Sequence, residues 1–193
     1  MRNDEELMVE YAAGHTEVLD EIFTRYKKRM FNYAFRLLQN QADAEDVVAE
    51  LFCMLSGKKD AYEPTHKFST WFYTVAHNIC MSKLRMRKRT IGMWFQREKE
   101  SGELKQWDVP DRAPSPAEAV QTRDTASYIK QAVEKLGFLE KEALILREYQ
   151  KLRYDEIAAI LGFTGAKIKI ILYRARQKLK KQLQRLIAEA DNV

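Results

Sequence analysis

Hydrophobic residues recur at intervals of three and four along most of this chain, which is the spacing of one face of an α-helix. Between residues 16 and 40 this spacing is kept at eight positions: Ile22, Phe23, Tyr26, Met30, Phe31, Ala34, Leu37 and Leu38. Sustained alternation, the pattern of a β-strand, is missing from the sequence, and only seven glycines and four prolines interrupt its 193 residues. The pattern therefore predicts an all-α protein.

The first half is predicted to begin with three helices. Asp4 can cap a short helix that ends at Gly14, and a long helix over residues 16–40 follows. Asp43 is the expected N-cap of a third helix, over residues 44–56, because a second acidic residue follows it three positions on.

A fourth helix is predicted over residues 67–89, where an aromatic segment ends in positive charge. One face of its helical wheel carries the residues expected to be buried, namely Phe68, Trp71, Phe72, Val75, Ile79 and Met86. The opposite face is expected to point outward and carries Thr70, Tyr73, Thr74, His77, Met81 and Lys88, with Asn78 and Arg85 on the flank. Such a helix suits nucleic acid, although an amphipathic core helix with a solvated basic end fits this stretch equally well.

The sequence changes character after residue 89. Residues 90–115 combine proline, mixed charge and little periodicity, which predicts a flexible linker between two helical domains. Beyond it, helices are expected at about residues 116–135, 139–149, 154–161 and 165–187. The last two helices, joined across Gly162, are typical of a helix-turn-helix, whose second helix enters the major groove of DNA. An ordinary helical hairpin with a solvated basic face is the alternative interpretation.

The charge and cysteine content of the chain limit the kinds of partner and cofactor that it is expected to bind. The formal charge of +5 and the pI of about 9.1 favour an anionic partner, nucleic acid before an acidic membrane. Cys53 and Cys80 are far apart, so two buried reduced thiols are expected rather than a disulfide or a metal site. The acidic N-terminus is unlike a signal peptide, and no apolar run reaches the ~18 residues of a membrane span. We therefore expect a cytoplasmic protein with no cofactor, metal or membrane insertion.

Three stretches together resemble the extracytoplasmic-function sigma factors, the small two-domain branch of bacterial transcription initiation factors. They are DAEDVVAELF at residues 43–52, FSTWFYTVAHN at residues 68–78, and YDEIA at residues 154–158 running on to YRAR at residues 173–176. The resemblance implies a protein that is not an enzyme. It would bind core RNA polymerase, direct it to specific promoters and help to open the duplex.

The resemblance also implies a division of the chain. Residues 1–89 would form region 2, which binds polymerase and recognises and melts the minus-ten element. Residues 90–115 would be the linker, and residues 116–193 would form region 4, whose helix-turn-helix reads the minus-thirty-five element. Members of this family are usually held inactive by an anti-sigma factor, so such a partner is implied as well.

A stripe on the helix over residues 44–56 is the expected polymerase surface. Its inward positions are Val48, Leu51, Phe52 and Leu55, which leaves Asp43, Asp46, Val47, Glu50 and Met54 on an outer stripe. An acidic and apolar stripe repels DNA and suits a protein partner. In the resembled family this surface docks on the clamp helices of the largest polymerase subunit. Solvated acidic residues are the simpler interpretation.

DNA contacts are expected from two parts of the chain. By resemblance, Asn78 lies where the family contacts a captured minus-ten base, beside a polar loop over residues 57–67 that suits base capture. The residues expected to hold phosphates are Lys83, Arg85, Arg87, Lys88 and Arg89. The residues expected at the minus-thirty-five groove are Lys167, Lys169, Ile170, Tyr173 and Arg174. Arg176 lies at the border of the buried face and is expected to pair with an acid.

The helix-turn-helix departs from the family pattern. Ala166-Lys167 replaces the usual Gly-Thr, and Ile170-Ile171 replaces the usual Ser-Arg. Ile171 lies on the buried face, whereas Ile170 faces outward, toward a thymine methyl or a protein. Arg153 stands where a serine cap is usual, so a weaker helix start is expected, with its guanidinium available for a phosphate.

Two other functions compete with the sigma-factor interpretation. One is a helix-turn-helix regulator that acts without stable association with polymerase; the acidic stripe argues against it. The other is an enzyme acting on nucleic acid, with metal ligands drawn from Asp43, Glu45, Asp46 and Glu50. These acids have no histidine near them in the sequence, and the chain has no glycine-rich phosphate loop.

Overall fold

The computed structural model describes residues 2–57, 62–63, 67–101 and 128–190, with side chains to residue 87 in the first half and to residue 186 in the second. The first half contains α1 (Asp4–Ala12), α2 (Val18–Leu38), α3 (Gln41–Gly57) and α4 (Phe68–Ser101). The second half contains a helical segment at 128–134, then α6 (Phe138–Leu144), the π-helical turn η1 (Ile145–Tyr149), α7 (Tyr154–Leu161) and α8 (Gly165–Ala190). These ranges contain helices and no strand, so the all-α prediction is confirmed.

Two helices begin earlier than predicted, because an asparagine supplies each N-cap. Asn3 rather than Asp4 caps α1: its Oδ1 accepts the Glu6 N–H at 2.6 Å, and the Glu6 carboxylate accepts the Asn3 N–H at 2.9 Å. α3 begins at Gln41 because the Oδ1 of Asn40 accepts the N–H of Asp43 at 2.9 Å. Asp43, predicted to be the cap, therefore lies inside the first turn.

α4 is longer than predicted. It continues to Ser101, past residue 89, where its end was expected. Residues 90–101 hold one glycine, Gly92, and no proline, so nothing in this stretch stops a helix. The remainder of the predicted linker, and the predicted helix start at residue 116, lie outside the described residues. None of the helices in the described ranges is long and apolar enough to cross a membrane.

Side chains of α1 form hydrogen bonds with the start of α4 and with the end of α3. The Glu5 carboxylate accepts the N–H of Phe68, the first residue of α4, at 2.9 Å. The Tyr11 hydroxyl lies 3.2 Å from the carbonyl of Leu55 and 3.0 Å from that of Ser56, near the end of α3. Helix ends carry backbone groups without helical partners, and α1 supplies those partners here.

An aromatic core fills the first half. Phe68 and Phe72 are fully buried, and each meets the Tyr26 ring edge-on with ring centroids 5.4 Å apart. Trp71, partly buried, stacks on Phe72 at 6.1 Å, so the prediction that these two residues support the core is confirmed. Met86, predicted to share that face, is 65% exposed, so the prediction is wrong for this residue; it is the next residue, Arg87, that reaches the α2–α3 junction, where it donates to the carbonyl of Leu38.

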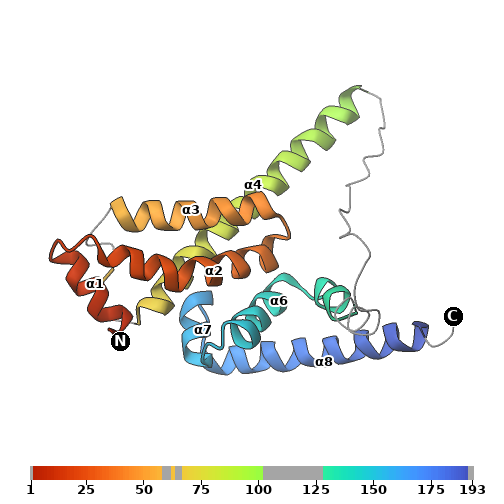
Figure 1. Cartoon of the computed structure of the whole chain (residues 1–193). Coiled ribbons are helices and arrows are strands. Elements are labelled where there is room, and N and C mark those ends of the chain that lie inside the picture. The colour runs from red at the N-terminus through yellow and green to blue at the C-terminus, as the bar shows by residue number, and fades with distance from the viewer. Residues whose placement is uncertain (1, 58–61, 64–66, 102–127, 191–193) are drawn as a thin grey trace, which may run out of the picture.

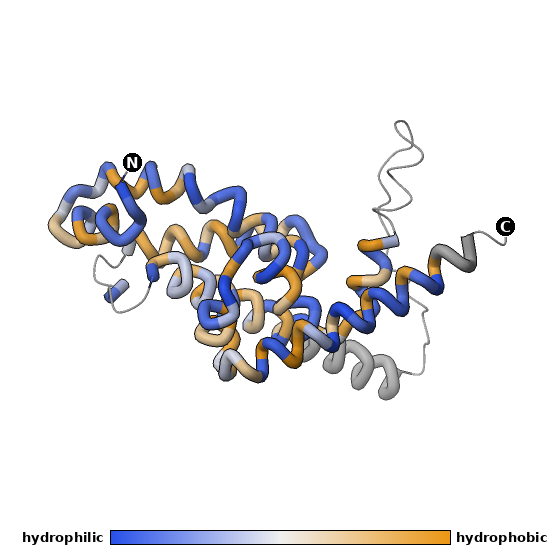
Figure 2. Tube along the Cα trace, turned by 90° about the horizontal axis from the view of Figure 1, so that it is seen from below, coloured by the Kyte–Doolittle hydropathy of each residue, from blue (hydrophilic) through white to orange (hydrophobic). Residues whose placement is uncertain are grey.

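The second half packs directly on the first. α7 lies against α4, and η1 lies against α2 (Figure 1). One cluster of buried hydrophobic residues includes side chains from both halves. α8 runs along the outer side of this second layer, and Figure 2 shows hydrophobic and hydrophilic residues alternating along it toward the C-terminus, as in an amphipathic helix.

Candidate nucleic-acid and protein interfaces

α7 and α8 form the predicted helix-turn-helix. α7 ends at Gly162, whose φ of +70° is readily adopted by glycine. The next residue, Phe163, donates its N–H to the carbonyl of Ala158 at 2.9 Å, which closes the turn. Thr164 then starts α8, since its hydroxyl accepts the N–H of Lys167 at 3.3 Å.

All residues predicted to face the DNA groove are exposed on α8, namely Lys167, Lys169, Ile170, Tyr173 and Arg174; this set is called the α8 face below. Ile170 and Tyr173 are 52% and 63% exposed, which is high for side chains of their size. On the opposite side, Ile168 and Leu172 are fully buried, and Ile171 is 8% exposed as predicted. Their predicted exposure on the outer side of α8 is confirmed, whereas their place in a DNA groove and their contacts with bases stay predictions.

Arginines around the helix-turn-helix are paired with acids. Arg176 lies 2.7 Å from the Glu148 carboxylate, so its predicted structural pairing is confirmed. The Arg153 guanidinium, predicted to be available for a phosphate, lies 2.7 Å from the Asp155 carboxylate. α7 has a firmer start than expected without a serine, because the Glu156 carboxylate accepts the Arg153 N–H at 2.7 Å.

The predicted polymerase stripe on α3 borders α4, and only part of it is open to solvent, since Asp46 and Glu50 are exposed. Val47 is fully buried, so its predicted place on the surface is wrong; α3 packs against both α2 and α4 and therefore buries a wide arc. Asp43 pairs with Arg87 of α4 at 2.6 Å. Asp46 and Glu50 lie 3.1 and 3.2 Å from Lys83. Met54 is partly buried.

The same ion pairs reduce the number of cations at the basic end of α4 that are free to bind phosphates. Lys83 and Arg87, both predicted to hold phosphates, already have carboxylate partners, and the Lys83 side chain is only 17% exposed. Arg85 is exposed. The side chains of Lys88 and Arg89 lie outside the described residues. We call the contacts of Lys83 and Arg87 with the α3 acids the α3–α4 ion-pair seam.

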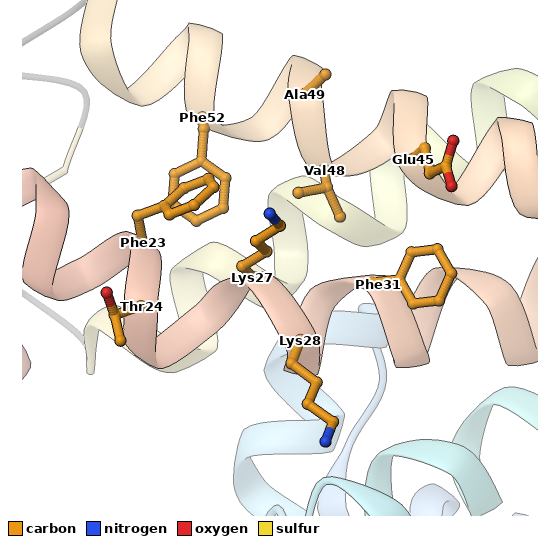
Figure 3. A pocket seen from close by; sticks show the side chains of 9 residues that line it. All are labelled: Phe23, Thr24, Lys27, Lys28, Phe31, Glu45, Val48, Ala49 and Phe52. Atoms are coloured by element: carbon orange, nitrogen blue, oxygen red, sulfur yellow. The ribbon is translucent and has the colours of Figure 1, made fainter.

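A groove of about 750 Å³ lies between α2 and α3. Figure 3 shows Phe23 of α2 and Phe52 of α3 in contact with each other at one end of it, with ring centroids 4.7 Å apart. Lys27 lies 5.0 Å from the Phe23 ring. The remaining lining residues are Thr24, Lys28, Phe31, Glu45, Val48 and Ala49. Apolar walls with charged residues beside them are typical of a protein-binding surface.

This groove could not be predicted from helical spacing, which groups Phe23 and Phe31 with the core positions of α2. Phe23 is 38% exposed, and Phe31 is only partly buried. Lys27 and Lys28 are both exposed on the same stretch of α2. The sequence does contain one indication of the groove: phenylalanines alternate with lysines along this stretch of α2, and such a pattern is typical of an apolar face that is partly exposed to solvent.

Asn78 and the residues before α4 lie beside the aromatic core. Asn78 is exposed on α4, as its flank position predicted. In the predicted base-capture loop, residues 58–61 and 64–66 lie outside the described residues. Tyr62 is 8% exposed, and its ring centroid lies 5.4 Å from that of Phe68 and 5.6 Å from that of Trp71. Tyr62, which belongs to the described part of this loop, therefore packs on the aromatic core.

The face of α4 that was predicted to point outward is largely covered. Tyr73 is fully buried and Thr70 is 7% exposed, so the prediction is wrong for both, because the second half packs over them. The Tyr73 hydroxyl donates to the Gln150 side chain at 2.5 Å. Burial raises the pKa of Tyr73 to about 12, so its phenol stays protonated and remains a donor.

A second polar contact between the halves centres on Glu142 of α6. Its Oε1 accepts from the Tyr33 hydroxyl at 2.5 Å and lies 2.7 Å from Nδ1 of His77. Burial, together with the Glu142 carboxylate, raises the pKa of Tyr33 well above its ordinary value, which keeps this phenol a donor too. Glu142 and Tyr33 are fully buried.

The two cysteines differ from each other. Cys80 is buried, as predicted, and burial raises the pKa of its thiol to about 12. Cys53 is exposed on α3, so its predicted burial is wrong; the arc of α3 that carries it faces away from α2 and α4. Among the described residues, no group of potential ligands could hold a metal ion.

Comparison with known proteins matches both halves of the chain. A family model described as Sigma-70 region 2 matches residues 22–90, and one described as Sigma-70, region 4 matches residues 126–179. The RNA polymerase sigma factor YlaC of Bacillus subtilis (strain 168) is 29% identical over 171 residues, which are 88% of this chain and 94% of YlaC. The ECF RNA polymerase sigma factor SigW of the same organism is 26% identical, over 90% of this chain and 92% of SigW.

Two solved structures share the fold. CnrH, in complex with the cytosolic domain of CnrY, is 18% identical with a TM-score of 0.67, over 93% of this chain and 96% of CnrH. The sigma factor RpoE in complex with the anti-sigma factor NepR, from Bartonella quintana, is 23% identical with a TM-score of 0.64, over 86% of this chain and 96% of that chain. At these identities the likeness concerns the fold alone.

Proposed function

Because the chain belongs to the sigma-70 family, we propose that it works as an extracytoplasmic-function sigma factor in the cytoplasm. It binds core RNA polymerase, directs it to specific promoters and helps to open the duplex. The observation that carries this function is the presence of regions 2 and 4 in order on one chain, with an exposed α8 face in the second. Sigma factors supply binding and positioning to the polymerase, and we assign this chain no chemistry of its own.

Transcription in vitro tests this function directly. Core polymerase with this protein is expected to give discrete transcripts from genomic DNA, whereas core polymerase alone gives none at those starts. The regulator alternative predicts the reverse: the protein stays apart from polymerase on gel filtration and binds duplex DNA tightly alone. That result would overturn the proposed function. Sequencing the transcripts also identifies the promoters that later experiments need.

The three parts of the chain divide this work. Residues 1–89 form the polymerase-binding and minus-ten part, and residues 116–193 form the minus-thirty-five part. The linker, predicted over residues 90–115, is shortened at its start by the continuation of α4 to Ser101. Asp46 and Glu50 keep side-chain exposures of 63% and 55% despite their pairing with Lys83, so they remain available to a protein partner.

The polymerase surface extends from these acids across α3 to the α2–α3 groove. A helical partner can fill an apolar groove with its own hydrophobic face, as helix-in-groove recognition does. Phe23→Glu puts a charge on the groove wall and is expected to weaken binding to core polymerase at least tenfold, measured by a labelled-sigma titration. Thr16→Glu, at an exposed position before α2, is the matched control. Equal binding by both variants would remove the groove from the polymerase surface.

Asn78 is assigned to the minus-ten element, where its amide can donate to and accept from a base edge. Asn78→Ala is expected to lower the rate of promoter opening, followed by permanganate reactivity of unpaired thymines, with little loss of polymerase binding. Asn32→Ala, on α2, is the matched control. If Asn78→Ala lowered polymerase binding and promoter opening equally, the base-capture role would be wrong.

An anti-sigma factor is the second proposed protein partner. In each of the two solved structures compared above, the similar chain is bound to a second protein, and one of these second proteins, NepR, is named as an anti-sigma factor. The exposed apolar groove between α2 and α3 offers a surface that polymerase and such an inhibitor could compete for.

A further inference from the structure

The first helix, α1, contacts both ends of the base-capture loop (residues 57–67). At the start of the loop, the Tyr11 hydroxyl donates to the carbonyl of Ser56, in the last turn of α3, at 3.0 Å. At its end, the Glu5 carboxylate accepts the N–H of Phe68, the first residue of α4, at 2.9 Å. Both junctions between the loop and the helices beside it are therefore tied to one helix.

Tyr62, in the described part of the loop, also lies close to α1. Its side chain is buried against Phe68 and Trp71. Burial raises the pKa of the Tyr62 hydroxyl, and the negative charges of Glu5 and Asp4 raise it further, so both acids of α1 are near this phenol. Glu5 therefore acts on the loop at two points, Tyr62 and the junction with α4.

α1 is itself held firmly on α2. Three residues on its apolar side are at most 2% exposed, namely Leu7, Met8 and Tyr11. On its polar side, Asp4 accepts from the Tyr26 hydroxyl at 2.5 Å and lies 2.5 Å from the Arg25 guanidinium, and both partners belong to α2. α1 is therefore fixed to the helical core independently of the loop, and it can hold the loop in place relative to that core.

α1 lies outside the part of the chain that matches the region 2 model, which begins at residue 22, ten positions after α1 ends at Ala12. The family match therefore assigns no role to its side chains. We propose that Glu5 and Tyr11 of α1 are positioning residues for the base-capture loop, and that through the loop they set how strictly the minus-ten base is selected. This proposal rests on the proposed function, because the contact of the loop with DNA belongs to that function.

Fixed ends give a loop both affinity and selectivity. They reduce the conformational entropy that is lost when the loop binds a ligand. A recognition site that its surroundings hold in place also cannot shift to accommodate a wrong base. The contact of Glu5 is expected to be the stronger of the two, because a charged acceptor forms a stronger hydrogen bond than a neutral carbonyl. Removing Glu5 should therefore affect base selection more than removing the Tyr11 hydroxyl.

Base discrimination by the full-length protein with core polymerase tests this role. The measurement is the ratio of affinities for forked minus-ten fragments that differ only at the captured base, from a promoter mapped by the transcription assay. Tyr11→Phe is expected to lower this ratio about threefold, as the loss of one hydrogen bond implies, and Glu5→Ala is expected to lower it further. Misfolded protein lowers the apparent affinity for every fragment equally and cancels in the ratio, so general damage does not produce this result.

Two further variants on α1 separate positioning from a loss of negative charge. Glu10→Ala removes a carboxylate from the same helix, one that pairs with Arg2 rather than with the loop, and is expected to keep the ratio of the parent. Glu5→Gln keeps an oxygen that can accept the Phe68 N–H and is expected to restore most of the ratio lost in Glu5→Ala. An equal loss in Glu10→Ala and Glu5→Ala would overturn the positioning role.

Amide hydrogen exchange of the free protein tests the contact itself, without DNA. The Phe68 N–H is expected to exchange faster in Glu5→Ala than in the parent, and at the parent rate in Glu10→Ala. An unchanged rate in Glu5→Ala would overturn the proposal at this junction.

The parent protein shows which idea has failed if base selection is not as expected. If the parent with core polymerase discriminates between bases, and Glu5→Ala and Tyr11→Phe discriminate equally well, the role of α1 is wrong and the proposed function stands. If the parent binds every fragment with the same affinity, base capture by the loop is wrong, and the role of α1 falls with it.

Discussion

The α8 face, which is proposed to bind DNA, and the covered face of α4, which carries Thr70, Tyr73 and His77, are both polar sides of amphipathic helices, but they are held in different ways. α8 packs its apolar side on α6 and α7 and leaves Tyr173 63% exposed. α4 packs its aromatic side on α2 and α3, and its polar side then receives the second half, which buries Tyr73 completely. One face is ready for a partner, and the other is already in use within the chain. The two helices therefore differ in how much of their polar side is open to a partner.

The largest expected contrast comes from the two tyrosines. Tyr73→Ala removes a fully buried ring that packs edge-on against Tyr33 at 5.4 Å, and should lower the free energy of unfolding by about 3 kcal/mol. Tyr173→Ala removes an exposed ring and should change it by no more than about 0.5 kcal/mol. Chemical denaturation followed by circular dichroism measures both. Equal losses of stability would show that the two faces are not held differently.

A smaller effect is expected at Arg174. If it forms bidentate contacts with a base, Arg174→Ala should weaken binding to the minus-thirty-five element by about 1–3 kcal/mol and relax the preference at that base. Fluorescence anisotropy with duplexes altered at single positions measures both quantities. Gln177→Ala, one turn further along α8, is the control. An equal loss of affinity for all duplexes would indicate that Arg174 contacts a phosphate rather than a base.

The smallest effect is expected at Arg176. Its ion pair with Glu148 leaves the two side chains 46% and 48% exposed, and solvent-exposed pairs contribute no more than about 1 kcal/mol. Arg176→Ala should therefore change neither stability nor promoter preference by more than that amount. Glu148→Ala provides the reciprocal variant. A change in base preference for Arg176→Ala alone would place this residue on the α8 face.

The periodicity of hydrophobic residues correctly predicts those features of the fold that depend on a single helix. The buried side of α8 and the support of Trp71 and Phe72 follow from spacing alone. Tyr73 was misplaced because a helical wheel says which residues share a face but not what covers that face. Its cover comes from residues more than seventy positions away, such as Gln150, which no local pattern connects to α4.

The candidate sites divide in the same way. The α8 face could be predicted because one helix carries all of it. The acids of α3 were expected to meet a protein, but Asp43 pairs with Arg87, and local spacing does not encode a contact between separate helices. The α2–α3 groove was missed for a related reason, since helical spacing shows that Phe23 shares a face with core residues but not how far another helix covers that face.

The α3–α4 ion-pair seam also limits how strongly salt can act on DNA binding by the first half. Each phosphate that a cation neutralises releases condensed counterions, which contributes about 0.9 to the slope of log affinity against log salt for duplex DNA. A cation that already faces a carboxylate displaces fewer counterions when it approaches a phosphate. With Lys83 and Arg87 engaged in this way, a count of basic residues on α4 overstates the charge that DNA meets. The first half should therefore keep more of its DNA affinity in concentrated salt than its sequence suggests.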